Sequence, residues 1–224
     1  MKKSIFILLV LITSGVYSQV FRPLLNLSTA RGGDFEKNEF FEIGLGAEFK
    51  VKDFLIPELV ISYSVGNLGQ SIRFNDNNEI NASSKADMTA VNFAFSPKIA
   101  VYSNSTKRVR LYISPKYNYS IVNAQNEFVN AKSSGEAILP YEFYQSKSNI
   151  QSLGIGLGFC VDFSEKDSDS MAVNLFFNNI EHGNAFNKLS KMNKLIDTSS
   201  SVGLGITYYF NFKNRYEEKI LPLK

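Results

Sequence analysis

The chain has 224 residues, with 24 Lys and Arg against 21 Asp and Glu and a formal net charge of +3. This near balance lacks the strongly basic surface of a nucleic-acid-binding protein, so we expect no nucleic acid as a partner. The single cysteine, Cys160, excludes an internal disulfide, and one cysteine with one histidine gives too few ligands for a Cys/His metal site. We expect no cofactor.

The first residues have the pattern of a cleaved export signal. Lys2 and Lys3 precede the apolar run IFILLVLI at residues 5–12, and a more polar stretch follows. The run is much shorter than the about 20 residues that a membrane-spanning helix needs. We therefore predict a signal peptide over residues 1–18, cleaved after Ser18.

Beyond the signal, apolar residues alternate with small or polar ones in eight separate segments, which is the period of a β-strand with two different faces. In residues 201–212, SVGLGITYYFNF, the even positions are apolar or aromatic and the odd positions are small or polar. The eight predicted strands, in chain order, are residues 20–30, 39–51, 54–65, 89–102, 108–121, 151–163, 170–179 and 201–212.

Short and long connections alternate between these strands. Short connections follow the second, fourth and sixth strands, whereas long polar segments follow the third, fifth and seventh at about 66–88, 122–150 and 180–199. An up-and-down meander has this pattern when its two ends meet different surroundings, and here every short connection falls on the side of the two chain termini. Within the last long segment, apolar residues at helical spacing predict a short helix over 185–196.

Eight alternating strands fit either a soluble barrel with its apolar face inward or a membrane barrel with its apolar face outward. The glycines of three strands lie on the polar face, where a narrow interior accepts only small side chains. The apolar faces carry no charged residue, and one Arg or Lys there would cost about 2–4 kcal/mol at the centre of a bilayer. We therefore predict an all-β, closed, eight-stranded antiparallel up-and-down transmembrane β-barrel over residues 19–212, with a tail over 213–224.

Two further features concern the strands themselves. Aromatic residues cluster near strand ends on the apolar face, as in the aromatic girdles of membrane barrels. Pro57, Pro97 and Pro115 interrupt three predicted strands, and a proline removes one hydrogen bond from a sheet ladder. We expect bulges or local bends at these prolines.

The signal, the alternating strands and the closing segment GLGITYYFNF resemble the small outer-membrane β-barrel family that includes OmpX-like, OmpA-transmembrane-like and PorT-like proteins. Phe210 and Phe212 match the aromatic-ended insertion signal of that family, although twelve residues follow Phe212 here. The resemblance implies a porin-like protein of the Gram-negative outer membrane, with periplasmic termini and long extracellular loops. We further expect outer-membrane lipid, lipopolysaccharide and the barrel-insertion machinery as partners.

The polar faces carry charges of both signs. In a narrow barrel these charges should pair, because an unpaired buried charge is costly. The pairs would form either a plug that closes the bore or a narrow polar channel with a gate. The residues of this predicted interior charge network are Arg22, Glu42, Glu48, Lys50, Glu58, Lys98, Arg110, Lys116 and Asp162.

The last long connection holds two further candidate sites. His182 follows Glu181, and serines at 199–201 begin the next strand, but no nucleophile motif accompanies them. Lys188, Lys191 and Lys194 recur every third residue, so they either contact lipopolysaccharide phosphates or form an ordinary solvated loop face.

Three functions are compatible with these residues. The first is a non-enzymatic outer-membrane barrel that presents extracellular loops for interaction or adhesion, or that serves an envelope or secretion assembly with other envelope proteins. The second is a narrow solute pore. The third is a lipid-modifying outer-membrane enzyme that uses His182.

Overall fold

The computed structural model describes residues 21–32, 39–52, 54–78, 80–104, 108–131, 137–163, 169–179 and 200–210. The predicted signal, the predicted helix over 185–196, Phe212 and the C-terminal tail lie outside these ranges. Within them, no helix has the length and hydrophobicity that a membrane-crossing helix needs. The strands are β1 Phe21–Gly32, β2 Glu39–Phe49, β3 Leu55–Phe74, β4 Ile80–Asn104, β5 Val109–Ala131, β6 Ala137–Asp162, β7 Ser170–Asn179 and β8 Ser201–Tyr209.

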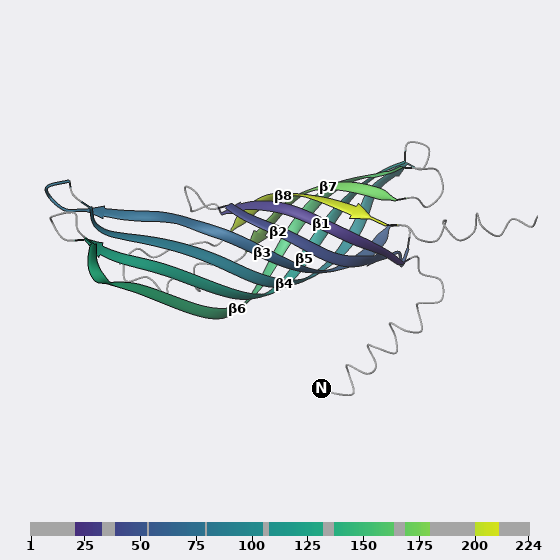
Figure 1. Ribbon diagram of the computed structural model, residues 1–224. Coiled ribbons are helices and arrows are strands. Elements are labelled where there is room, and N and C mark those ends of the chain that lie inside the picture. The colour runs from purple at the N-terminus through teal and green to yellow at the C-terminus, as the bar shows by residue number, and fades with distance from the viewer. Residues whose placement is uncertain are drawn as a thin grey trace, which may run out of the picture.

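The eight strands form one closed antiparallel barrel in sequence order, in which β1 pairs with β8 (Figure 1). Closure leaves no sheet edge around the barrel, which is the condition for a sheet in hydrocarbon, where no water can bond to free backbone groups. The start of β1 and the end of β8 lie at the same end of the barrel, opposite the long hairpins (Figure 1). The predicted all-β, up-and-down, eight-stranded fold is confirmed.

Apolar side chains cover the outside of the barrel. In β8, Val202, Leu204 and Ile206 are more than half exposed, whereas Gly203 and Gly205 between them are buried. The same division holds on the other strands. Soluble monomers rarely expose so continuous an apolar surface to water, whereas lipid contact requires it.

Aromatic side chains gather at the end of the barrel where β1 begins. Phe21 packs on Phe49 with ring centroids 5.4 Å apart. Tyr208 contacts Phe163 at 6.1 Å and Phe210 at 4.8 Å between centroids. These rings form a girdle of the kind that membrane barrels place at a lipid–water interface, and Phe210 belongs to it.

Two of the three long connections are not loops, contrary to the sequence-based expectation. β3 and β4 continue through most of 66–88, and β5 and β6 continue through most of 122–150. Between β3 and β4 the chain reverses in a tight turn, where the Asn75 side-chain oxygen accepts the Asn77 backbone N–H at 3.0 Å. The four strands therefore extend as a sheet beyond the other four (Figure 1). We use the name protruding sheet for the part that extends, which consists of residues 67–74, 80–88, 123–131 and 137–149.

The alternation continues through the protruding sheet, but its two faces exchange character. The outward positions next to the barrel change from apolar to polar, with Lys85, Asp87, Asn123, Gln125, Gln145 and Lys147, whereas Ile72, Phe74 and Phe143 farther out are exposed apolar residues. At the junction of the barrel and the protruding sheet the buried positions become apolar, with Ala86, Met88, Ala90, Val122, Ala124 and Ile150 in one cluster with Phe40, while Asn126 farther out is buried and polar. A strand that leaves hydrocarbon for water must reverse its pattern in this way, because its outward side chains then meet water. Sequence reasoning followed only the outward apolar positions and therefore ended these strands too early.

The prolines are accommodated differently from the expectation. The β3–β4 register passes through Pro57 and Pro97 as direct partners with no shift. The β4–β5 ladder instead has no paired residues between Phe95 and Ile99, the stretch that lies opposite Pro115. This gap contains Pro97, which like Pro115 has no N–H to donate, and the same ladder shifts register a few residues further on, between Ala100 and Tyr102.

Candidate functional site

Eight of the nine charged residues predicted for the interior lie on the inward side of the barrel wall. They are Arg22, Glu42, Glu48, Glu58, Lys98, Arg110, Lys116 and Asp162, each buried or half-buried. The expectation for Lys50 is wrong: this residue is exposed because β2 ends at Phe49, so the strand alternation no longer directs its side chain inward. The eight interior groups are four cations and four carboxylates, so their formal charges cancel.

Glu48 is the centre of an ionic cluster near the end of the barrel where β1 begins. Its Oε1 accepts a hydrogen bond from Arg22 Nε at 2.6 Å, and the Arg22 Nη2 group also pairs with it. Its Oε2 accepts one from Lys98 Nζ at 2.6 Å. Glu48 is 3% exposed and Lys98 4%. Removal of either charge would leave the other buried without its main partner, which is costly.

Lys98 has an acceptor for each of its three N–H groups. Besides Glu48, Lys98 Nζ lies 2.7 Å from Glu58 Oε2 and donates to Tyr209 Oη at 2.8 Å. The Tyr209 hydroxyl donates to Glu58 Oε2 at 3.1 Å, and its ring centroid lies 4.3 Å from Lys98 Nζ. The ammonium is therefore fully satisfied inside the barrel.

A second set of contacts joins the opposite wall to this cluster. Asp162 Oδ1 accepts hydrogen bonds from Arg110 Nη2 and from the Ser170 hydroxyl, both at 2.6 Å. Arg22 Nη1 donates to Ser170 Oγ at 2.7 Å. Arg22 thus connects Glu48 on one side of the bore to Ser170 and Asp162 on the other.

Every strand contributes one side chain to this arrangement, which we call the charge cluster. In order from β1 to β8 these are Arg22, Glu48, Glu58, Lys98, Arg110, Asp162, Ser170 and Tyr209. Beside it, a cavity leaves only ≈ 10 Å³ for the centre of a water molecule, enough for about one water. The buried Nε of Arg110 has no acceptor among the described residues and borders this cavity, so a water there would complete its bonding. The charge cluster fills the bore at this level.

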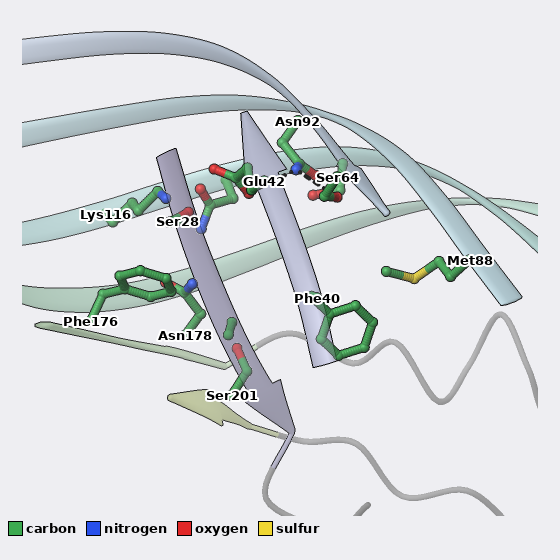
Figure 2. Close-up of a pocket in the computed structure, with 13 residues that line it drawn as sticks. Ser28, Phe40, Glu42, Ser64, Met88, Asn92, Lys116, Phe176, Asn178 and Ser201 are labelled. Atoms are coloured by element: carbon green, nitrogen blue, oxygen red, sulfur yellow. Dashed lines mark hydrogen bonds between the residues drawn. The ribbon is translucent and has the colours of Figure 1, made fainter. Parts of the chain in front are cut away.

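Between the charge cluster and the long hairpins, the lumen is polar and less tightly packed. Two cavities lie there, in which the centres of water molecules can occupy volumes of ≈ 60 and ≈ 40 Å³. Glu42 and Lys116 line both cavities. Figure 2 shows these two side chains turned toward one space, with Asn92 donating to Glu42 Oε2 at 3.1 Å. Lys116 Nζ lies 5.5 Å from the Phe176 ring centroid and makes no ion pair within the described part of the chain. The space fits a few water molecules between these two charges.

Sequence reasoning missed the uncharged members of the lumen network. The Tyr112 hydroxyl donates to Asn174 Oδ1 at 2.5 Å, and Asn174 Nδ2 donates to Thr207 Oγ1 at 2.9 Å. Asn26 Nδ2 donates to the same Thr207 oxygen at 2.8 Å. The signal was available, because these residues and Tyr209 occupy the inward positions of their strands. They carry no charge, and the predicted network contained only charged residues.

The interior is as narrow as the glycines on its face suggested. A Cβ on Gly158 would collide with the Tyr112 ring of the neighbouring strand, and one on Gly203 would collide with the Phe176 ring. In both pairs the glycine and the aromatic residue are direct cross-strand partners. The large ring occupies the space that the missing side chain leaves open.

Of the remaining candidate residues, the structure describes Cys160 but not those of the last long connection. Cys160 is buried, with Arg110 Nη2 at 3.7 Å from its sulfur. No group of three or more His, Cys, Asp or Glu residues in the described ranges has the arrangement of a metal site. His182, Lys188, Lys191 and Lys194 lie outside those ranges. They stay sequence-based predictions.

No protein-family model matches the sequence, and no curated protein matches it significantly. Among solved structures, Neisserial surface protein A is 11% identical with a TM-score of 0.46, over 87% of this chain and 97% of that one. A major outer membrane protein from Thermus thermophilus is also 11% identical with a TM-score of 0.46, over 84% and 99%. The attachment invasion locus protein Ail of Yersinia pestis is 12% identical with a TM-score of 0.38, over 86% and 97%. These likenesses concern the barrel fold alone.

Proposed function

We propose that this protein is a non-enzymatic barrel of the outer membrane that holds a rigid four-stranded sheet outside the cell for interaction with other proteins. The observation that carries the proposal is the exchange of faces along β4, β5 and β6. The outward side is apolar within the barrel and becomes polar where the protruding sheet begins, at Asp87, Asn123 and Lys147, with Phe143 as an exposed apolar residue farther out; we take this change as the level between hydrocarbon and water.

The height of the apolar band supports a membrane-spanning position. From Leu153 on β6 to Phe163, the residue directly after this strand, the outward side chains are apolar or aromatic. Ten steps along a strand cover about 34 Å, and the usual strand tilt reduces this to a height of about 25 Å. That height equals the apolar band of outer-membrane barrels.

An epitope tag tests the orientation. A short tag inserted at Asn77, in the turn between β3 and β4, should be bound by antibody on intact cells, because this turn lies at the tip of the protruding sheet. A matched tag at Lys52, in the turn between β2 and β3, should be bound only after the outer membrane is permeabilised. Equal labelling of both tags on intact cells would contradict the proposed orientation.

The charge cluster supports a closed barrel over a narrow solute pore. Its side chains span the bore from all eight strands, and their charges are paired within it. An ion that crosses would have to displace these buried pairs, which is costly. We expect no stable current steps when the purified barrel is inserted into planar bilayers. Reproducible single-channel steps that persist at neutral pH would favour the pore.

The protruding sheet supports the interaction role. It continues the barrel wall as ordered strands, so it holds its outward side chains in fixed positions, as a binding surface requires. A variant with both long hairpins shortened, so that Asn67 is joined to Asp87 and Asn123 to Lys147 by tight turns, should keep a heat-modifiable folded barrel. It should lose adhesion or the assembly of its envelope partners. Unchanged adhesion and assembly in this variant would remove the sheet from the function.

A further inference from the structure

We propose that the outward face of β5 and β6, directly above the apolar band, docks the phosphorylated saccharide head group of a lipopolysaccharide molecule in the outer leaflet. This inference rests on the proposed placement in the outer membrane. The surface consists of five amide side chains and one lysine, and we call it the amide patch: Asn123, Gln125, Gln145, Lys147, Asn149 and Gln151.

The strand register brings these side chains together. Asn123 pairs with Lys147 and Gln125 pairs with Gln145 across the two strands, and all face outward. Gln145 Nε2 donates to Asn123 Oδ1 at 2.9 Å, which orients both amides on the exposed surface. Cross-strand partners on one face of a sheet lie close enough for one ligand to contact both.

The amide patch begins where the hydrocarbon-facing surface ends. Asn149 lies opposite Ile121, and Gln151 lies opposite Tyr119, whose ring is paired with Phe93 on the next strand. Leu153, the next outward residue on β6, is 68% exposed and belongs to the apolar band. A lipid whose chains cover Leu153 and its neighbours therefore has its head group at the level of the amide patch.

The chemistry of the amide patch suits a sugar phosphate. Amide groups both donate and accept hydrogen bonds, as saccharide hydroxyls require, and a lysine binds phosphate as a compact cation. Lys147 is exposed and makes no ion pair within the described ranges. Two acidic residues share this outward face: Asp87 lies opposite Gln125 with its carboxylate paired with Lys85 at 3.3 Å, and Glu127 lies two residues beyond Gln125 on β5, opposite Lys85 rather than Lys147. The cation of Lys147 therefore stays available to an anionic ligand on this face.

This pairing supplies a matched control for the experiment. Lys85 and Lys147 lie on the same outward face of the protruding sheet, but Lys85 is already paired with Asp87. The full chain and its variants are folded into vesicles of phosphatidylethanolamine and phosphatidylglycerol that contain rough-type lipopolysaccharide, extracted in mild detergent, and assayed for lipopolysaccharide per barrel. Heat-modifiable migration verifies folding in every sample.

We expect Lys147→Gln to lower the retained lipopolysaccharide about threefold, the scale of one exposed charge contact. Lys147→Gln combined with Gln145→Ala and Asn149→Ala should reduce retention to that of a barrel folded without added lipopolysaccharide. Lys85→Gln should leave retention unchanged. Equal losses in Lys85→Gln and Lys147→Gln, or no retention by the folded natural chain, would overturn the inference while leaving the proposed outer-membrane role intact. A chain that fails the epitope test would overturn that role separately.

Discussion

Replacement of Lys98 by methionine should destabilise the barrel by about 3–5 kcal/mol, the cost of leaving a buried ion without its partner. Lys98 holds Glu48 and Glu58 together, and the variant leaves two buried carboxylates with less compensation. Methionine has a similar length, so the change removes the charge with little change in packing. Equilibrium urea unfolding of the barrel in lipid vesicles, followed by tyrosine fluorescence, measures the free energy of unfolding.

Two further variants identify the cause of this loss. Lys85→Met removes the exposed pair with Asp87 and should change the free energy of unfolding by less than about 1 kcal/mol. Glu48→Gln combined with Lys98→Met should recover part of the stability, because it removes one of the two carboxylates that lose Lys98, while Arg22 keeps its bond to Ser170 and lies 4.0 Å from Asp162. A Lys98→Met barrel as stable as the natural one would show that the charge cluster does not hold the strands together.

Gly158→Ala should be the second strongly destabilising change, by about 1–3 kcal/mol, because its Cβ collides with the ring of Tyr112. The ring has little freedom to move, since the Tyr112 hydroxyl is bonded to Asn174. The folded fraction after refolding into vesicles, read as heat-modifiable migration, should fall together with the free energy of unfolding.

Gly156 provides the matched control, two residues earlier on the same inward face of β6. A Cβ there would meet its nearest neighbour at 3.5 Å, an ordinary contact, so Gly156→Ala should be neutral or slightly stabilising. In a Tyr112→Leu background the cost of Gly158→Ala should shrink, because the colliding ring is gone. If Gly156→Ala and Gly158→Ala cost the same, the effect arises from the loss of glycine in a strand rather than from the aromatic partner.

The alternation of residues was sufficient to predict the barrel and the direction of its faces. Leu204 and Gly203 illustrate the reason: in a strand, neighbouring side chains point to opposite sides, so a periodicity of two carries the orientation of the whole strand. The uncharged outward faces predicted lipid contact for the same reason. Both properties are local, so they can be recognised in a single strand without knowledge of the strands that pair with it.

The sequence predicted which charged residues face inward, but it could not predict which of them pair with one another. That Glu48 lies between Arg22 and Lys98 depends on the register of three strands, and Tyr209 reaches Glu58 only because β8 closes on β1. Lys50 shows the limit of periodicity, since one residue past the end of a strand is enough to lose the inward direction.

The sequence by itself determined the number of strands, the barrel class and which residues face inward within the membrane band, because these follow from side-chain periodicity. Only the tertiary structure decided where β3 to β6 end, how the interior charges pair and which glycines lie beneath aromatic rings. Those features depend on contacts between strands far apart in the chain and on the solvent that each level meets. The exchange of faces at Ala90 and Val122 becomes apparent only when the neighbouring strands are in place.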